Sequence, residues 1–194
     1  MISALMPRRS PRPNDRPLRL LPPADVLARF ERALAAQDGV DGAHCIHELW
    51  MRGEFAQNIE RALERLWQSA AKTVPEWLPM RYVSWLPPAY EVASGFKAGA
   101  KGKSNVYLVL LDYSDRRGDT HGVYVGMSEY SPAERFDQHK AGIRASGSVL
   151  KRGIEVLTGP TLHLQRITRK EAARIESELA AALADAGIKV EGGH

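Results

Sequence analysis

Five polar side chains in the second half of the chain are candidates for a chemical site: Tyr107, Tyr124, Arg135, His139 and Glu176. Arg135 and His139 are four residues apart, so on a helix they would share one face. Arginine offers a planar fork of donors that suits phosphate, and histidine can carry a proton near neutral pH. The same spacing is common on a solvated helix face, so both interpretations of this pair stay open.

Glu176 lies at the margin of the apolar stripe of a helix expected over residues 168–185. The stripe consists of Ala172, Ile175, Leu179 and Leu183. At about 100° per residue, Glu176 falls at its edge. A carboxylate there needs a partner, because burying an unpaired charge is costly. Glu176 is therefore either a metal ligand or a carboxylate that reaches solvent or pairs with an arginine.

The two tyrosines lie in short apolar segments, 106–111 and 122–126, which we expect to form strands. The polar loop between the segments predicts an antiparallel pair. Side chains alternate along a strand, so a suitable register would bring both hydroxyls to one face of the sheet. Gly126 follows Tyr124 closely and would let a ligand approach the backbone.

The elements that must position these residues follow from hydrophobic spacing. Apolar side chains at helical spacing predict helices at 25–37, 44–51 and 54–72. In the second half, capping boxes predict helices at 131–141 and 168–185, with strands near 154–157 and 162–167. The order strand, strand, helix, strand, helix predicts an α+β fold with a central antiparallel sheet flanked by helices, preceded by a small helical domain.

Composition divides the chain into four segments. Residues 1–21 combine prolines with five arginines and predict a disordered basic tail, either merely solvated or a phosphate-binding arm. Residues 22–93 form the helical domain, 94–103 a glycine- and lysine-rich linker, and 104–194 the second domain. Aromatic residues near the end of the helical domain suit hydrophobic anchors better than base-stacking platforms: Trp77, Tyr82, Trp85 and Tyr90.

Charge and cysteine content limit the class of protein. The net charge of +4 suits an anionic partner without identifying one. No run of about 18 apolar residues is present, so we expect no membrane partner. Cys45 is the only cysteine, which excludes an internal disulfide and fits a reducing cytoplasm. His44, Cys45 and His47 lack a fourth ligand, so we expect no metal site there.

The two tyrosine segments resemble the halves of the signature that names the GIY-YIG nuclease superfamily. Val106-Tyr107-Leu108 is similar to the first half, and Tyr124-Val125-Gly126 is similar to the second. Ser128 matches the small hydroxyl residue that usually follows. Asn105 stands where the name-giving glycine would be, and Met127 replaces a common lysine.

The two C-terminal helices complete the resemblance, in the same order and at matching spacing. Arg135 and His139 fall where the family keeps an arginine and, in many members, a histidine. Glu171-Ala172 followed by Glu176 is similar to the helix that carries its single acidic metal ligand. An asparagine that many members place after this helix has no match. The resemblance covers residues 104–194, whereas the helical domain resembles no family that we can name.

The resemblance implies a metal-dependent endonuclease that hydrolyses phosphodiester bonds, with DNA a better candidate substrate than RNA. Glu176 would hold one Mg²⁺ or Mn²⁺. Tyr107 would act as general base on the attacking water, helped by His139. Arg135 would bind the scissile phosphate, and Tyr124 would orient water or phosphate.

Several further residues are weaker candidates for nucleic-acid contacts: Gly126, Ser128, Lys140, Arg144, Lys151 and Arg152. The charged members of this set are equally well interpreted as solvating side chains. Three alternatives to a DNA endonuclease stay open. They are a non-catalytic nucleic-acid-binding module of the same fold, a nuclease acting on RNA, and an interaction protein whose helical domain binds a protein partner.

Overall fold

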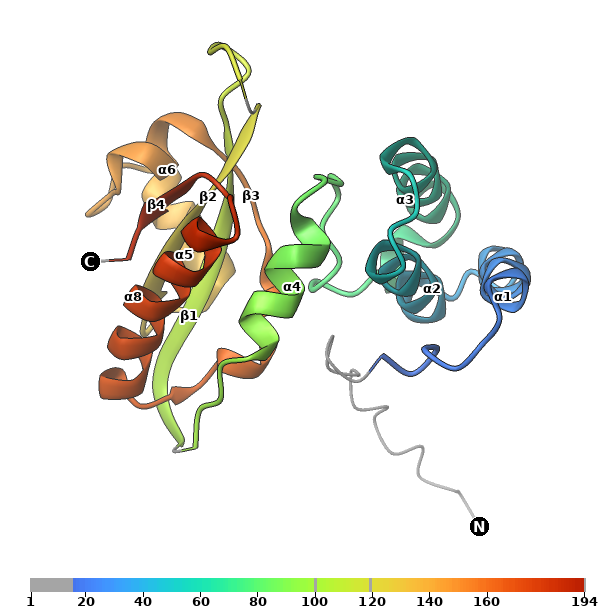
Figure 1. Ribbon diagram of the computed structural model, residues 1–194, viewed down its shortest axis with the longest axis horizontal. Coiled ribbons are helices and arrows are strands. Elements are labelled where there is room, and N and C mark those ends of the chain that lie inside the picture. The colour runs from blue at the N-terminus through green and yellow to red at the C-terminus, as the bar shows by residue number, and fades with distance from the viewer. Residues whose placement is uncertain (1–15, 100, 119, 194) are drawn as a thin grey trace.

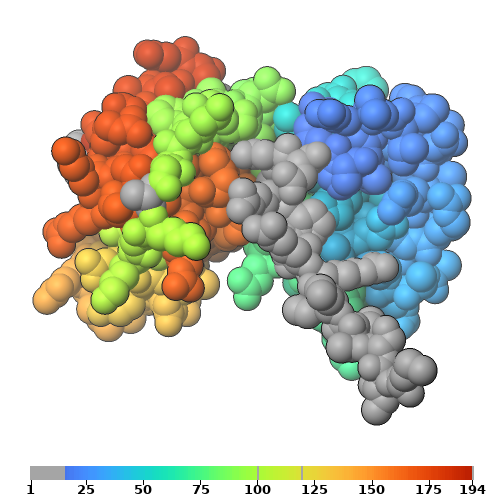
Figure 2. Space-filling view, turned by 90° about the horizontal axis from the view of Figure 1, so that it is seen from below, coloured from blue at the N-terminus to red at the C-terminus, as the bar shows by residue number. Residues whose placement is uncertain are grey.

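The computed structural model describes residues 16–99, 101–118 and 120–193, and these form two adjoining parts (Figure 1). The first part contains the helices α1 (Pro23–Ala35), α2 (Gly39–Met51) and α3 (Ala56–Ala70). The second contains a four-stranded sheet of β1 (Lys101–Asp112), β2 (His121–Ser128), β3 (Gly153–Val156) and β4 (Val190–Gly192). Figure 2 shows the parts as neighbouring lobes, blue to cyan and green to red. Within the described ranges, no helix is both long and apolar enough to cross a membrane.

The three helices of the first part lie where the apolar spacing predicts them, although α2 is longer than expected. Nearly every side chain of α2 is buried, so its sequence lacks the polar face that would mark a helix. A Cβ at Gly42 would meet Leu66 Cδ1 at 2.4 Å. Glycine therefore allows α2 to approach α3 closely. Cys45 is fully buried in this packing, and burial raises the pKa of its thiol to about 12.

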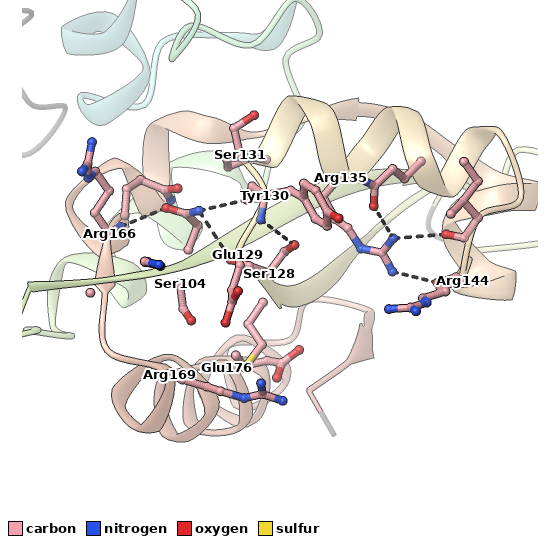
Figure 3. A pocket seen from close by; sticks show the side chains of 18 residues that line it. Ser104, Ser128, Glu129, Tyr130, Ser131, Arg135, Arg144, Arg166, Arg169 and Glu176 are labelled. Atoms are coloured by element: carbon pink, nitrogen blue, oxygen red, sulfur yellow. Dashed lines mark hydrogen bonds between the residues drawn. The ribbon is translucent and has the colours of Figure 1, made fainter.

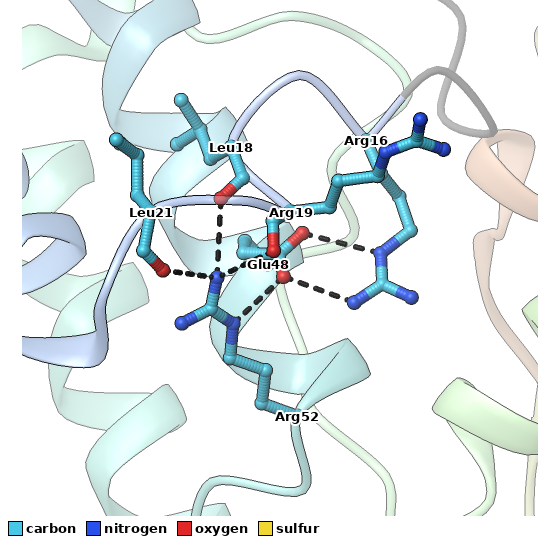
Figure 4. Close-up of polar contacts among 6 residues, drawn as sticks. All are labelled: Arg16, Leu18, Arg19, Leu21, Glu48 and Arg52. Carbon is cyan, nitrogen blue, oxygen red and sulfur yellow. Dashed lines mark hydrogen bonds and ion pairs between the residues drawn. The ribbon is translucent and has the colours of Figure 1, made fainter.

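Residues 16–21, assigned from sequence to the disordered tail, pack against this helical part (Figure 4). Leu18 is buried, and Glu48 lies 2.9 Å from Arg16 Nη2 and 2.7 Å from Arg52 Nε. Burial raises the pKa of Glu48, but the two arginine hydrogen bonds outweigh it and hold the pKa below its usual value. This stretch of the predicted tail is therefore ordered, and the rest lies outside the described residues.

The predicted linker is also shorter than expected, because both of its ends belong to regular structure. Helix α4 (Leu86–Ser94) packs against α7 (Thr158–Thr161) and α8 (Arg169–Asp185), so it belongs with the sheet. Strand β1 already begins at Lys101, since the Gly102 N–H donates to the Arg166 carbonyl. The division between the two parts consequently falls before α4, not at residues 94–103.

Aromatic side chains join the two parts, as the sequence predicts. Trp77, Tyr82 and Tyr90 are buried, and Trp85 is half-buried against the same core. The Tyr90 ring centroid lies 4.7 Å from that of His47 on α2. These residues are hydrophobic anchors, so they are not available as stacking platforms for nucleobases.

The sheet has the strand order β3-β1-β2-β4 and is mixed. Strand β1 pairs antiparallel with β2 and β3, as expected, but β4 runs parallel to β2. A wholly antiparallel sheet was therefore the wrong prediction. The short, glycine-containing β4 carries too little strand pattern to be seen in the sequence. The strand predicted at 162–167 is instead the 3-10 helix η3 (Leu162–Leu164), a bend at Gln165 and Arg166, and isolated bridges from Ile167 to Lys101 and Ser104.

Helices cover both faces of the sheet, and each face has its own core. Val106, Leu108 and Leu110 of β1 point into the larger core with α4 and α8. Tyr107 and Val109 point to the opposite face, which is covered by α5 (Pro132–Lys140) and α6 (Gly147–Arg152). This second face holds Tyr107, Tyr124 and the helix that carries Arg135 and His139, whereas Glu176 lies on α8.

Candidate active site

The register of β1 and β2 brings the two predicted tyrosines to one face of the sheet. Tyr107 lies opposite Gly126, and Tyr124 lies opposite Val109. The centroids of the Tyr107 and Tyr124 rings are 6.2 Å apart. A Cβ at Gly126 would meet Tyr107 Oη at 2.7 Å. Gly126 is therefore required because the tyrosine rings lie over it, whereas the sequence suggested close approach of a ligand.

His139 on α5 contacts the Tyr107 hydroxyl in a defined tautomer. The His139 Nε2 atom is 3.0 Å from Tyr107 Oη, and Nδ1 is 2.9 Å from the backbone nitrogen of Ser146. A backbone N–H can only donate, so Nδ1 accepts and carries no proton. The proton of the neutral ring is therefore on Nε2, which donates to Tyr107 Oη.

The surroundings of the three rings keep them uncharged near neutral pH. Burial, aided by the nearby Arg135 guanidinium, lowers the pKa of His139 to about 4. Burial raises the pKa of Tyr107, and Tyr124 raises it further, while Arg135 acts in the opposite direction. Burial and the negative charge of Glu176 raise the pKa of Tyr124. No member of the cluster is thus a ready base without an additional positive charge nearby.

We expect His139 to remain neutral, with its proton on Nε2, from about pH 8 down to about pH 5. Its folded pKa of about 4 is below the unfolded value of about 6.5, so the unfolded chain binds the proton first. The free energy of unfolding should accordingly decrease as pH falls from about 6.5 to about 4. Long-range ¹H–¹⁵N NMR, assigned by comparison with His139→Gln, measures the tautomer directly. Titration of His139 near its ordinary pKa would contradict the buried tautomer.

Arg135 on α5 shapes the loop that follows its own helix. It donates from Nη1 to Gln138 Oε1 (3.0 Å) and to the Ile143 carbonyl (3.2 Å), and from Nη2 to the Arg144 carbonyl (2.7 Å). These bonds engage three of the five N–H groups of the guanidinium. Arg135 therefore has a structural task that the sequence did not predict, beside its expected contact with phosphate.

Glu176 on α8 faces a cleft of about 1430 Å³ between α8, the end of β2 and α5 (Figure 3). Only 8% of Glu176 is exposed. The lining includes five cationic side chains, Lys103, Arg135, Arg144, Arg166 and Arg169, against the two carboxylates of Glu129 and Glu176. The walls of the cleft are consequently positive on balance, with one nearly buried carboxylate among them.

The weaker candidates from sequence divide into two groups. Ser128 and Arg144 line the cleft. Lys140 instead donates to the Leu150 and Gly153 carbonyls, and it holds the end of α6. Arg152 binds the Asp115 carboxylate and lies 4.6 Å from the Tyr113 ring centroid, at the far end of β1. Lys151 is exposed on α6, and it is not among the residues that line the cleft.

Asn105 connects three walls of the cleft, a role that the sequence did not reveal. Its Nδ2 donates to the carbonyls of Tyr130 (2.9 Å) and, at longer range, Ser128 (3.4 Å). Its Oδ1 accepts from the Arg166 N–H at 2.9 Å. The Asn105 side chain thus joins β1, the turn after β2 and the segment before α8.

The acidic side chains of the cleft decide which kind of metal site it could form. Within the described part of the chain, no cluster of three or more histidine, cysteine, aspartate or glutamate side chains is arranged to hold a metal ion. Glu176, the nearly buried one of the two carboxylates in the cleft, fits Mg²⁺ or Mn²⁺, because these ions keep several waters and use substrate phosphate oxygens as ligands. The residues present therefore suit one hydrated divalent ion at Glu176 and not an ion enclosed by protein ligands.

Comparisons of the chain with profiles of protein families, with curated proteins and with solved structures gave no match. The resemblance to GIY-YIG nucleases therefore stays a prediction from the sequence. The interpretation of the site rests on the residues and contacts described above.

Proposed function

We propose that the chain is a metal-dependent endonuclease of the GIY-YIG type that hydrolyses phosphodiester bonds in DNA. The observation that carries the proposal is the proximity of four predicted residues from four elements, of which Arg135 and Glu176 line the cleft while Tyr107 and Tyr124 do not belong to its lining. Arg135 of α5 lies close enough to lower the pKa of both Tyr107 of β1 and Tyr124 of β2, and the charge of Glu176 of α8 raises that of Tyr124. Residues that far apart in sequence are brought together only by the fold.

The positive lining supports a phosphate-bearing substrate. Lysine and arginine side chains neutralise backbone phosphates and release their counterions. Arg135 would contact the scissile phosphate through the N–H groups that do not hold the loop, while its loop contacts fix the direction of the guanidinium. An arginine held in this way stabilises the charge that develops on the phosphate during displacement.

The tyrosine pair would handle the proton of the attacking water. Tyr107 accepts a proton only as phenolate, and the Nε2–H of His139 and the charge of Arg135 both favour that form. Burial acts against it, so the remaining stabilisation has to come from a cation. A divalent ion at Glu176 would supply that charge and stabilise the leaving oxygen. Tyr124, beside Glu176, would orient water or phosphate.

Two observations favour a second candidate, a nucleic-acid-binding module without catalysis. Burial raises the pKa of Tyr107, and Arg135 already uses several donors within the protein. A cleft with these properties can bind a phosphate backbone without cutting it. RNA would suit the same phosphate contacts, so it is the alternative substrate.

The test is cleavage of end-labelled DNA and RNA, each single- and double-stranded, with Mg²⁺, with Mn²⁺ and with a chelator. We expect metal-dependent internal cuts in DNA, because the proposed charge on Tyr107 depends on the ion. Binding is measured in parallel by fluorescence anisotropy in the chelator. Binding without any cleavage would support the non-catalytic module, and cleavage of RNA alone would reassign the substrate. A result in which the protein neither binds nor cleaves any of the nucleic acids would contradict both proposals.

A further inference from the structure

The cleft presents an aromatic ring that the proposed chemistry does not use. Tyr130 follows β2 and lines the cleft, yet 54% of it is exposed. Ile143, on the loop after α5, lines the same cleft and is 56% exposed. Tyr107 and Tyr113, by contrast, are almost fully buried. The exposed pair gives the cleft an apolar surface beside its arginines.

The backbone that carries Tyr130 is held at both of its polar groups. The Tyr130 N–H donates to Ser128 Oγ at 3.1 Å, and its carbonyl accepts from Asn105 Nδ2 at 2.9 Å. Asn105 is only 7% exposed and is itself anchored by the Arg166 N–H. The ring therefore stands on an ordered turn, so the protein backbone loses little conformational entropy when a ligand packs on the ring.

Positive charge lies on both sides of this ring. Arg135 and Arg144 belong to α5 and its loop, while Arg166 precedes α8 and Arg169 is its first residue (Figure 3). A nucleic-acid strand that places one phosphate by α5 and another by α8 would bring a base to the ring between them. Aromatic rings beside basic residues are typical of sites for unpaired bases, because every base offers a π face.

We propose that Tyr130 stacks on an unpaired nucleobase next to the phosphate bound in the cleft, so that the protein prefers DNA with unpaired bases over continuous duplex. In a duplex the faces of each base are covered by its neighbours, so Tyr130 has no free face to contact. This inference rests on the proposed function, since it assigns the substrate class of the same cleft. It concerns binding and not chemistry, so it can be tested apart from cleavage.

The test is the affinity of the full chain for a labelled oligonucleotide, single-stranded or in perfect duplex, by fluorescence anisotropy in chelator. Tyr130→Ala should weaken single-strand binding by about 5- to 150-fold, the range that one base stacked on an aromatic ring contributes. Duplex binding, which depends on the arginines, should change much less. Tyr130→Phe keeps the ring and should bind like wild type. Phe55→Ala, which removes a 78%-exposed aromatic ring from the first part of the chain, is the matched control.

Two outcomes would overturn the inference. One is equal weakening of single-strand and duplex binding by Tyr130→Ala, and the other is no weakening at all. A wild type that binds single strands through Tyr130 but cuts nothing would remove the nuclease proposal and leave the stacking site in place. If the wild type cuts DNA and Tyr130→Ala changes neither binding nor cleavage, the nuclease proposal would stand and the stacking site would be removed.

Discussion

Replacing Glu176 with glutamine is expected to reduce metal-dependent DNA cleavage by about 10²- to 10³-fold, the usual effect of losing one preorganised charge-stabilising group. Glutamine has nearly the same shape but no negative charge, and its amide is a poor ligand for a hard divalent ion. Among the described residues that line the cleft, Glu129 is the other carboxylate, and it is exposed whereas Glu176 is nearly buried. We therefore expect that Glu129 does not replace Glu176 as the ligand. The measurement is the initial rate of cleavage over a titration of Mg²⁺ and of Mn²⁺.

Glu178→Gln is the matched control for this variant. Glu178 lies on the same helix, is half-exposed and pairs with Arg174, so it shares the residue type without facing the cleft. Its activity and metal dependence should equal those of wild type, and circular dichroism should show both variants folded. Full metal-dependent activity in Glu176→Gln would show that the metal ligand is assigned wrongly. Equal losses in both variants would point to damage to α8 instead.

Replacing Tyr107 with phenylalanine is expected to lower kcat by about 10²- to 10⁴-fold, the typical contribution of general acid–base catalysis. The aromatic ring stays in its packed position over Gly126, so only the hydroxyl and its hydrogen bond with His139 are lost. KM should change little, because the proposed phosphate contacts come from arginines. The measurement is single-turnover cleavage at saturating protein, which separates binding from chemistry.

Tyr113→Phe is the control for the loss of a buried tyrosine hydroxyl. Tyr113 immediately follows β1, belongs to the same core as Tyr107, and donates to Glu191 Oε1 at 2.8 Å. Both variants should lose about 1 kcal/mol of stability with their hydrogen bond, so only a difference in rate reports on chemistry. If the two variants cut equally well, Tyr107 would be a packing residue. A general base makes the cleavage rate increase with pH. If this increase is lost in Tyr107→Phe but kept in Tyr113→Phe, the result would support Tyr107 as the general base.

The local patterns of the chain sufficed to predict most helices and the two strands that carry Tyr107 and Tyr124. The capping box that begins α5 forms as expected between Ser131 and Glu134, and at the start of α8 the Thr168 side chain accepts from the Glu171 N–H. These contacts join residues three positions apart, so the chain sequence is enough to specify them. The alternation of β1 likewise decides which of its side chains can share a face with Tyr107.

Long-range contacts decided the rest of the site. Asn105 meets Arg166, and Tyr107 meets His139, only after the sheet and α5 have packed. The sequence indicated that Tyr107 and Tyr124 could share a face, but the register of β1 and β2 determined that they do. It also gave no sign that Lys140 or Arg152 would bind carbonyls of the protein itself instead of phosphate.

The sequence by itself determined which residue types were available and which positions of one helix or strand share a face. These properties depend on neighbours a few positions away. The tertiary structure alone decided the parallel pairing of β4, the ordered position of residues 16–21 and the partners of each charged side chain. An arginine or lysine has a long, flexible side chain, so its partner is whichever acceptor the fold brings within reach.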